Sequence, residues 1–231
     1  MPQAKDPLEQ LEQERRQRPA RRVEFHTQLD ACDRLLIEAA SLVADAIVPV
    51  TTAFLQADTY ASQHITGLEE VQRRCTELED AGYLLLARQA PVAGDLRRVI
   101  AVLCCAREVQ RSANLLGHIR DSLTWVHPPS MPEQLRQVIS QLGAVSSEIF
   151  YGGVEAWRRH DGLAAPELET RDDQVDLLQK VLLTEIYTGQ QSVEESVSLA
   201  LISRYYERIA DHGVELARQV SYFITGDRVD L

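Results

Sequence analysis

Prolines and glycines divide the chain into six long segments, and this spacing limits the fold more than any other feature. Only 11 glycines and 9 prolines occur among the 231 residues. Ala90-Pro91 ends one segment, and Ser192 with Glu195 forms a capping box that opens another. The segments cover about residues 23–57, 59–89, 92–125, 132–160, 166–189 and 192–226.

Apolar residues recur within these segments at helical spacing. Val193, Val197 and Leu201 repeat every four residues, and a second such pattern starts at Leu96. No segment sustains the alternation that a half-buried strand needs, so the sequence predicts an all-α protein with six long helices. Pro49 lies inside the first segment and predicts a kink or a break there.

An internal repeat relates the two halves of the chain. Three positions of the third segment recur 97 residues later in the sixth: Arg107, Arg111 and Ala113 correspond to Arg204, Arg208 and Ala210. The same offset places three long segments on three others, so we predict two tandem three-helix bundles with a pseudo-two-fold repeat. The two units cover residues 22–127 and 130–227, and we expect residues 1–21 to form a flexible N-terminal extension.

The charge balance excludes one class of partner. With 24 Lys and Arg against 35 Asp and Glu, the net charge is −11, and such a surface repels nucleic acid and anionic lipid. The first 22 residues differ, because six basic and four acidic residues give them a net charge of +2. We interpret them as a solvated tail, with an anion-binding arm as the alternative.

Targeting and redox signals are also missing from the sequence. The longest apolar run has about eight residues, 99–106, far short of a membrane span, and the first residues contain no apolar signal-peptide core. The four cysteines show neither zinc-site nor disulfide spacing. We therefore expect a reduced cytoplasmic protein that meets a membrane only through its partners.

The clearest candidate for chemistry is a set of carboxylates in the last two segments. Glu207 and Asp211 stand one turn apart on one helix face. Asp172 and Asp173 each lie within one turn of Asp176. If these helices are neighbours, four carboxylates face each other and form a site of hard oxygen ligands for Mg, Mn, Fe or Ca.

Nearby residues bear on this site in different ways. Arg204 and Arg208 each lie three residues before one of the two acids, so an ordinary surface lattice of ion pairs is the alternative. His212 points about 100° away from the preceding acid, so we do not count it as a ligand. Gln110 and Asn114 take the places of the two acids in the first repeat, which confines a metal site to the second unit.

Motifs of common enzyme classes do not occur. None of the six histidines follows a Glu by three residues, as a ferritin-like di-iron site requires. HExxH, phosphate-loop, dinucleotide-binding and GxSxG patterns are also missing from the sequence. We predict that the protein is not an enzyme.

Two long motifs resemble those of PhoU proteins. Residues 86–98, LARQAPVAGDLRR, are similar to the family's "rqxPvAxDLR" signature. Residues 204–217, RYYERIADHGVELA, followed by ITG at 224–226, are similar to its "RyyERiaDHaxxiA…xTG" ending. Residues 173–176, DQVD, resemble its "DxxvD" helix, and the whole resemblance covers about residues 22–227.

This resemblance implies a cytoplasmic regulator of phosphate uptake that represses the phosphate-starvation response when phosphate is plentiful. It implies two partners, the ATPase subunit of a phosphate ABC transporter and a PAS-containing sensor histidine kinase, and it implies a homodimer. Some PhoU proteins carry metal clusters on E/DxxxD motifs. Carried over, the second-repeat site would hold a divalent or ferric ion (Mg, Mn, Fe or Zn), or no metal, at Asp173, Asp176, Glu207 and Asp211.

A rigid acidic bundle of six helices offers long side faces for docking onto such partners. Our candidate contact patch is Asp95, Arg97 and Arg98 at the start of the third helix, and the alternative is that Asp95 caps this helix and pairs with Arg98. Two rival functions stay open from the sequence. One is a carboxylate-bridged metal protein with storage or hydrolytic activity, and the other is a purely structural helical protein with a different partner.

Overall fold

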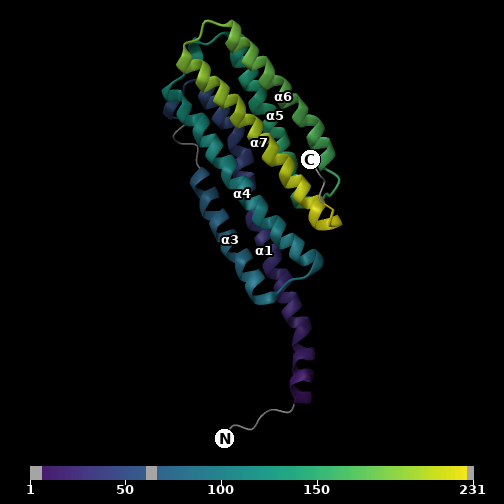
Figure 1. The fold of residues 1–231 in the computed structure, drawn as a ribbon. Coiled ribbons are helices and arrows are strands. Elements are labelled where there is room, and N and C mark those ends of the chain that lie inside the picture. The colour runs from purple at the N-terminus through teal and green to yellow at the C-terminus, as the bar shows by residue number, and fades with distance from the viewer. Residues whose placement is uncertain (1–6, 61–66, 228–231) are drawn as a thin grey trace.

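Long helices make up most of the molecule. The computed structural model describes residues 7–60 and 67–227, with side chains from residue 22 onward. Two 3-10 turns, Ser122–Thr124 and Pro128–Ser130, lie between the third and fourth of these long helices. The described residues contain no strand, so the predicted all-α fold is confirmed. Within this part of the chain the long helices are α1 Pro7–Leu55, α3 Leu68–Gln89, α4 Ala93–Asp121, α5 Glu133–Arg159, α6 Ala165–Thr188 and α7 Val193–Thr225 (Figure 1).

The ends of α3 and α7 follow from local signals. In the capping box of α7, the Glu195 amide donates to the Ser192 hydroxyl at 3.1 Å, and the Ser192 amide donates to the Glu195 carboxylate at 3.2 Å. α7 ends before Gly226, whose φ of 87° favours glycine. α3 ends at Gln89, directly before the predicted Ala90-Pro91 stop.

α1 runs unbroken through Pro49, so the proline does not split this helix. Pro49 removes the hydrogen-bond donor for the carbonyl of Asp45, but both residues lie on the exposed side of the helix. Ile47 and Val50, by contrast, are buried in the core. The burial of these neighbours outweighs the single lost hydrogen bond.

The N-terminal extension belongs in part to the same helix. Because α1 begins at Pro7, the backbone of residues 7–21 is helical. Residues 1–6 lie outside the described residues. The flexibility expected for residues 1–21 stays a prediction.

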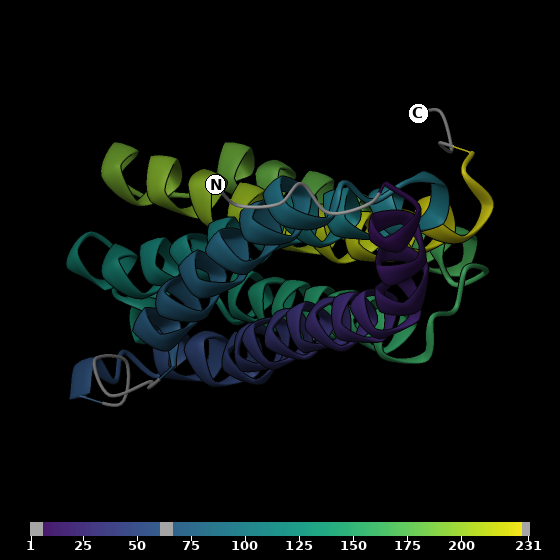
Figure 2. The same ribbon diagram turned by 90° about the horizontal axis from the view of Figure 1, so that it is seen from below.

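The helices form two three-helix bundles that lie side by side. α1, α3 and α4 pack on one another, and α5, α6 and α7 do the same. The bundles are joined where α4 packs on α7 and α1 packs on α5 (Figure 2). Each of these two contacts pairs equivalent helices of the two repeats, which is the arrangement that a pseudo-two-fold repeat requires.

One apolar core extends through both bundles, and α1 supplies much of it. Leu29, Leu36, Val43 and Ile47 are at most 1% exposed. By length and composition, residues 22–55 could also cross a membrane, but half of their apolar window is buried inside the molecule. The core position of α1 therefore accounts for its apolar character.

Buried polar contacts cross the junction between the bundles. Thr51 Oγ1 and the Tyr206 hydroxyl are 2.7 Å apart and join α1 to α7. His212 Nδ1 is 2.8 Å from Ser112 Oγ, and its Nε2 is 3.1 Å from Glu108 Oε2. These contacts set the position of α7 against α1 and α4.

Candidate functional site

The predicted carboxylates come together where α6 and α7 pack against each other. α6 carries Asp172 and Asp176 one turn apart, and α7 carries Glu207 and Asp211 at the same spacing. Glu207 is only 8% exposed, and Asp172 is half-buried. We call these four residues the acidic group.

Asp173 is placed differently from the other predicted ligands. Its side chain is exposed, and it influences the acidic group only through its neighbour Asp172. Asp172, which the sequence analysis noted beside Asp176 but did not include among the four expected ligands, takes the inward position. Adjacent positions of a helix point about 100° apart, and this difference decides which carboxylate faces α7.

Two carboxylate oxygens in the acidic group have no hydrogen-bond partner among the described residues. Arg204 donates to Glu207 Oε1, which satisfies one side of that carboxylate. Glu207 Oε2 and Asp172 Oδ1 are both buried without a hydrogen bond from any described residue. A buried oxygen of this kind favours binding of a proton or a cation.

The pKa values of the acidic group also favour binding of a proton or a cation. Burial raises the pKa of Glu207 to about 7, and the Asp211 carboxylate adds to the rise while Arg204 opposes it. Burial, followed by the charges of Asp211 and Asp176, raises the pKa of Asp172 to about 6. Burial also raises the pKa of Asp211, against the opposing charge of Arg204. The group therefore holds protons closer to neutral pH than free carboxylates do.

A metal ion does not fit these side chains as they lie. Among the described residues, no three His, Cys, Asp or Glu side chains are grouped closely enough to hold one. Carboxylate oxygens remain the right donors for a hard cation. Metal binding at the acidic group stays a proposal and is taken up below.

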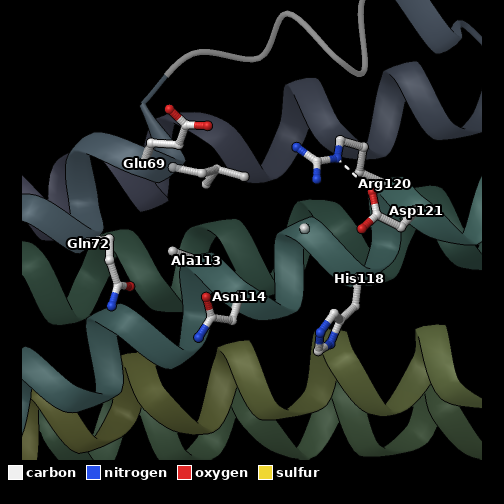
Figure 3. Close-up of a pocket in the computed structure, with 9 residues that line it drawn as sticks. Glu69, Gln72, Ala113, Asn114, His118, Arg120 and Asp121 are labelled. Atoms are coloured by element: carbon white, nitrogen blue, oxygen red, sulfur yellow. Dashed lines mark hydrogen bonds and ion pairs between the residues drawn. The ribbon is translucent and has the colours of Figure 1, made fainter.

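The first bundle has an open cavity, lined by both polar and apolar residues, in a related place. It lies between α3 and α4 and has a volume of about 540 Å³. Gln72 and Asn114 project toward it, and His118 lies farther along α4 (Figure 3). Arg120 and Asp121 pair with each other at 2.8 Å at its end.

The repeat shows how the side chains at this cavity differ from those at the equivalent positions of the second bundle. Offset by 97 residues, Gln72 and Asp121 correspond to Glu169 and Arg218, which form an ion pair of 2.7 Å in the second bundle. Gly117 occupies a position where adding a Cβ would meet nothing within 4 Å. The sequence reasoning missed this cavity, although comparing the repeats position by position would have shown the loss of the ion pair.

The predicted contact patch at the start of α4 is engaged within the chain. Asp95 lies 3.3 Å from His26 Nε2, and the helix has no side-chain cap, so the alternative of a capping Asp95 paired with Arg98 is wrong. Arg97 lies against Gly226 at the end of α7. Whether these residues also contact a partner stays a prediction.

Arg98 belongs to a network around the buried Asp33 that the sequence did not reveal. Its Nε donates to Asp33 Oδ2 at 3.0 Å, and its Nη2 donates to Asp30 at 2.8 Å. His160, at the end of α5, lies 3.5 Å from the same Asp33 oxygen. The network links α1, α4 and α5. The one signal for it in the sequence is Asp33, an aspartate on the otherwise apolar side of α1.

Comparison with known proteins gives consistent matches over both bundles. The family model described as "PhoU domain" matches residues 36–122 and 139–220. The phosphate-specific transport system accessory protein PhoU homolog 1 of Mycobacterium leprae is 33% identical over 209 residues, covering 89% of this chain and 94% of that protein. Homolog 2 of Mycobacterium tuberculosis is also 33% identical over 209 residues, covering 89% and 98%.

Solved structures show the same fold. The phosphate transport system regulatory protein PhoU from Streptococcus pneumoniae has a TM-score of 0.80 at 21% identity, covering 90% of this chain and 100% of that one. PhoU from Pseudomonas aeruginosa has a TM-score of 0.81 at 20% identity, covering 88% and 100%. At these identities the likeness concerns the arrangement of the helices.

Proposed function

Because this chain belongs to the PhoU family, we propose that it is a cytoplasmic regulator that couples a phosphate transporter to phosphate-starvation signalling. In this proposal it contacts the ATPase subunit of a phosphate ABC transporter and a PAS-containing sensor histidine kinase. It represses the response when phosphate is plentiful. The observation that carries the proposal is the family match over both bundles, together with relatives named as transport accessory proteins.

The structure supports a role in binding rather than catalysis. Ser112, His212 and Glu108 have the order of a nucleophile, a base and a carboxylate, but Ser112 is fully buried. Its hydroxyl donates to the Glu108 carbonyl at 2.9 Å, so it has neither access to substrate nor a free proton. These residues hold α4 and α7 together.

A pull-down tests the proposed partners. The tagged full-length chain is expressed in cells grown with high phosphate and with low phosphate, and the bound proteins are identified by mass spectrometry. We expect a phosphate-transporter ATPase and a PAS-containing kinase to be captured. If neither protein is captured, at high or at low phosphate, the adaptor role is contradicted.

A second arm of this experiment tests the predicted contact patch. Asp95→Ala removes a carboxylate that is partly exposed, and Asp45→Ala is the matched control because Asp45 is an exposed acid on α1. If Asp95 contacts a partner, only Asp95→Ala reduces capture while both variants keep the wild-type melting temperature. Equal capture by both variants would remove Asp95 from the interface.

Metal binding at the acidic group is a separate proposal. The unpartnered oxygens of Asp172 and Glu207 support it, whereas the described side chains would have to move to form a set of three ligands. Purified protein would be titrated calorimetrically with Mn²⁺, alongside Asp172→Asn and the matched variant Asp80→Asn on α3. We expect the wild type and Asp80→Asn to bind Mn²⁺ saturably and Asp172→Asn not to bind it. Heats of the wild-type protein equal to those of buffer alone would contradict the proposal.

A further inference from the structure

An apolar groove lies between α1 and α3 in the first bundle. It has a volume of about 230 Å³. Its floor is buried, since Leu85 is 3% exposed, whereas Leu84 at its side is 44% exposed. The residues that make it apolar come from both helices and are Ala31, Cys32, Leu35, Ala81, Leu84 and Leu85.

One end of the groove is polar and the other is not. Because α1 and α3 run antiparallel (Figure 1), Gln28 and Arg88 lie at one end, and Leu35 and Ala81 lie at the other. On each helix these two positions are seven residues apart, which is about 10 Å along the helix axis. A ligand that fills the groove is therefore apolar over most of its length and polar at one end.

Arg88 determines the charge of that polar end. It carries the one charge among the described residues that line the groove. Its side chain is exposed, and it makes no hydrogen bond or ion pair with another described residue. The guanidinium donors are therefore available to an anion of the ligand.

The equivalent positions of the second bundle are occupied by the chain itself. At the offset of 97, Ala81 and Arg88 correspond to Leu178 and Glu185. Leu178 is 9% exposed, and Glu185 accepts a hydrogen bond from Gln134 of α5 at 2.8 Å. The first bundle differs at both places, because Ala81 has a smaller side chain and Arg88 keeps its donors free for a ligand.

The size and charge of the groove narrow the class of ligand. An apolar cavity of about 150 Å³ holds benzene, so a volume of about 230 Å³ holds roughly nine carbon and oxygen atoms. A single guanidinium matches a singly charged carboxylate better than a phosphate monoester, whose charge is about −1.5 to −2. The net charge of −11 on the protein further disfavours a doubly charged ligand.

We propose that the groove between α1 and α3 binds a medium-chain carboxylate. Its carboxylate pairs with Arg88, and its alkyl chain lies along Leu84 and Leu85 toward Ala81. The site is in the opposite bundle from the acidic group, and it does not depend on the partners proposed above.

Calorimetric titration of the full-length chain with octanoate tests the proposal. We expect saturable binding with a dissociation constant of about 1 mM or tighter. Acetate lacks the alkyl chain and octylammonium reverses the charge of the head, so each should bind at least about tenfold more weakly. Saturation by neither probe is needed for this comparison, because both are also tested in competition with octanoate.

Two variants with matched controls locate the site. Arg88→Gln removes the cation, and Arg34→Gln is its control at an exposed position of α1 outside the groove. Ala81→Leu places in the groove the residue found in the second bundle, and Ala87→Leu is its control at an exposed position of α3. Circular dichroism confirms that each variant is folded, and Arg88→Gln alters only an exposed side chain.

Each groove variant should weaken octanoate binding about tenfold or more, whereas each control should stay within about twofold of wild type. The proposal is overturned if the wild type shows no saturable binding up to about 10 mM octanoate. It is also overturned if octylammonium binds as tightly as octanoate, or if either folded groove variant binds octanoate as tightly as wild type.

Discussion

The side chain of Glu207 combines burial, like-charged neighbours and an unpartnered oxygen. Its pKa is raised from 4.5 to about 7, so the folded protein binds this proton more tightly than the unfolded chain does. The contribution of Glu207 to stability is therefore most favourable at low pH and is lost as the pH rises from about 4.5 through 7. This sign is opposite to that of a carboxylate held in a strong ion pair.

Glu207→Gln should make stability less dependent on pH. The neutral amide carries no charge to desolvate, so we expect the variant to be more stable than wild type at pH 8 by on the order of 1–2 kcal/mol, after loss of the Arg204 pair. Near pH 4 this gain should vanish, because the wild-type carboxyl is then protonated in both states. Urea unfolding in a chelating buffer measures the difference.

Glu69→Gln serves as the control for this prediction, because Glu69 is an exposed glutamate at the start of α3. Its free energy of unfolding should follow the wild-type pH profile. A Glu207→Gln variant that is less stable than wild type at pH 8 would show that the Arg204 ion pair outweighs the cost of burying the charge.

Residue spacing identified most of this site but could not settle its details. Glu207 and Asp211 were predicted from their i, i+4 spacing, and the structure places both in the acidic group. The choice between Asp172 and Asp173 depends on the rotation of α6 about its axis, which its partner helices determine. The pairing of Arg98 with Asp33 spans 65 positions of sequence, and local patterns contain no information on such a contact.

Among the helices, α5 and α7 approach so closely that two glycines are needed between them. A Cβ at Gly153 would lie 2.1 Å from the carbonyl oxygen of Gly213, and a Cβ at Gly213 would lie 2.6 Å from the Cα of Phe150. Both obstacles are backbone atoms, which cannot turn aside as a flexible side chain can. These glycines therefore fix the distance between the helix axes.

Gly153→Ala should destabilise the protein by about 3 kcal/mol or more, because the helices must separate and lose core contacts. Gly117→Ala is the matched control, since that position lies within α4 and a Cβ there meets no atom within 4 Å. The control should gain about 0.5–1 kcal/mol, because alanine has the better helix propensity. Denaturant unfolding compares the two, and equal effects would contradict the close packing.

Helix ends that carry a local signal were predictable, whereas the starts of the first two segments, expected near residues 23 and 59, lie at Pro7 in α1 and at Leu68 in α3. The capping box at Ser192 and the stop at Ala90-Pro91 are local signals, and both helix ends lie where these signals indicate. Pro49 misled the sequence reasoning because its cost is also local, whereas the burial of Ile47 and Val50 comes from other helices. Tertiary packing outweighed a local preference at this position.

At the scale of the whole molecule, a few buried polar contacts align the two bundles. Thr51 Oγ donates to the Ile47 carbonyl at 2.8 Å, so the Tyr206 hydroxyl is the donor in its 2.7 Å contact with Thr51. This hydrogen bond joins α1 of the first bundle to α7 of the second. Removing the Tyr206 hydroxyl should weaken the junction, but it leaves no donor unsatisfied because Thr51 still donates to the Ile47 carbonyl.

Tyr206→Phe should therefore reduce the free energy of unfolding by about 1 kcal/mol. Tyr205→Phe is the neighbouring control, because the Tyr205 ring packs at 5.5 Å from His118 and phenylalanine keeps that ring. The control should change stability by less than about 0.5 kcal/mol. Thermal and urea unfolding of both variants test the prediction, and indistinguishable variants would show that the hydrogen bond contributes nothing net.

The position of α1 in both bundles also has a consequence for synthesis on the ribosome. α1 packs on α3 and α4, which follow it closely, and on α5, which ends at residue 159. Until α5 has emerged, the apolar side of α1 that it will cover stays open to the cell, in the segment apolar enough to resemble a membrane span. The nascent chain therefore presents a binding site for chaperones during much of translation, and a ribosome stalled between α4 and α5 should hold them longest.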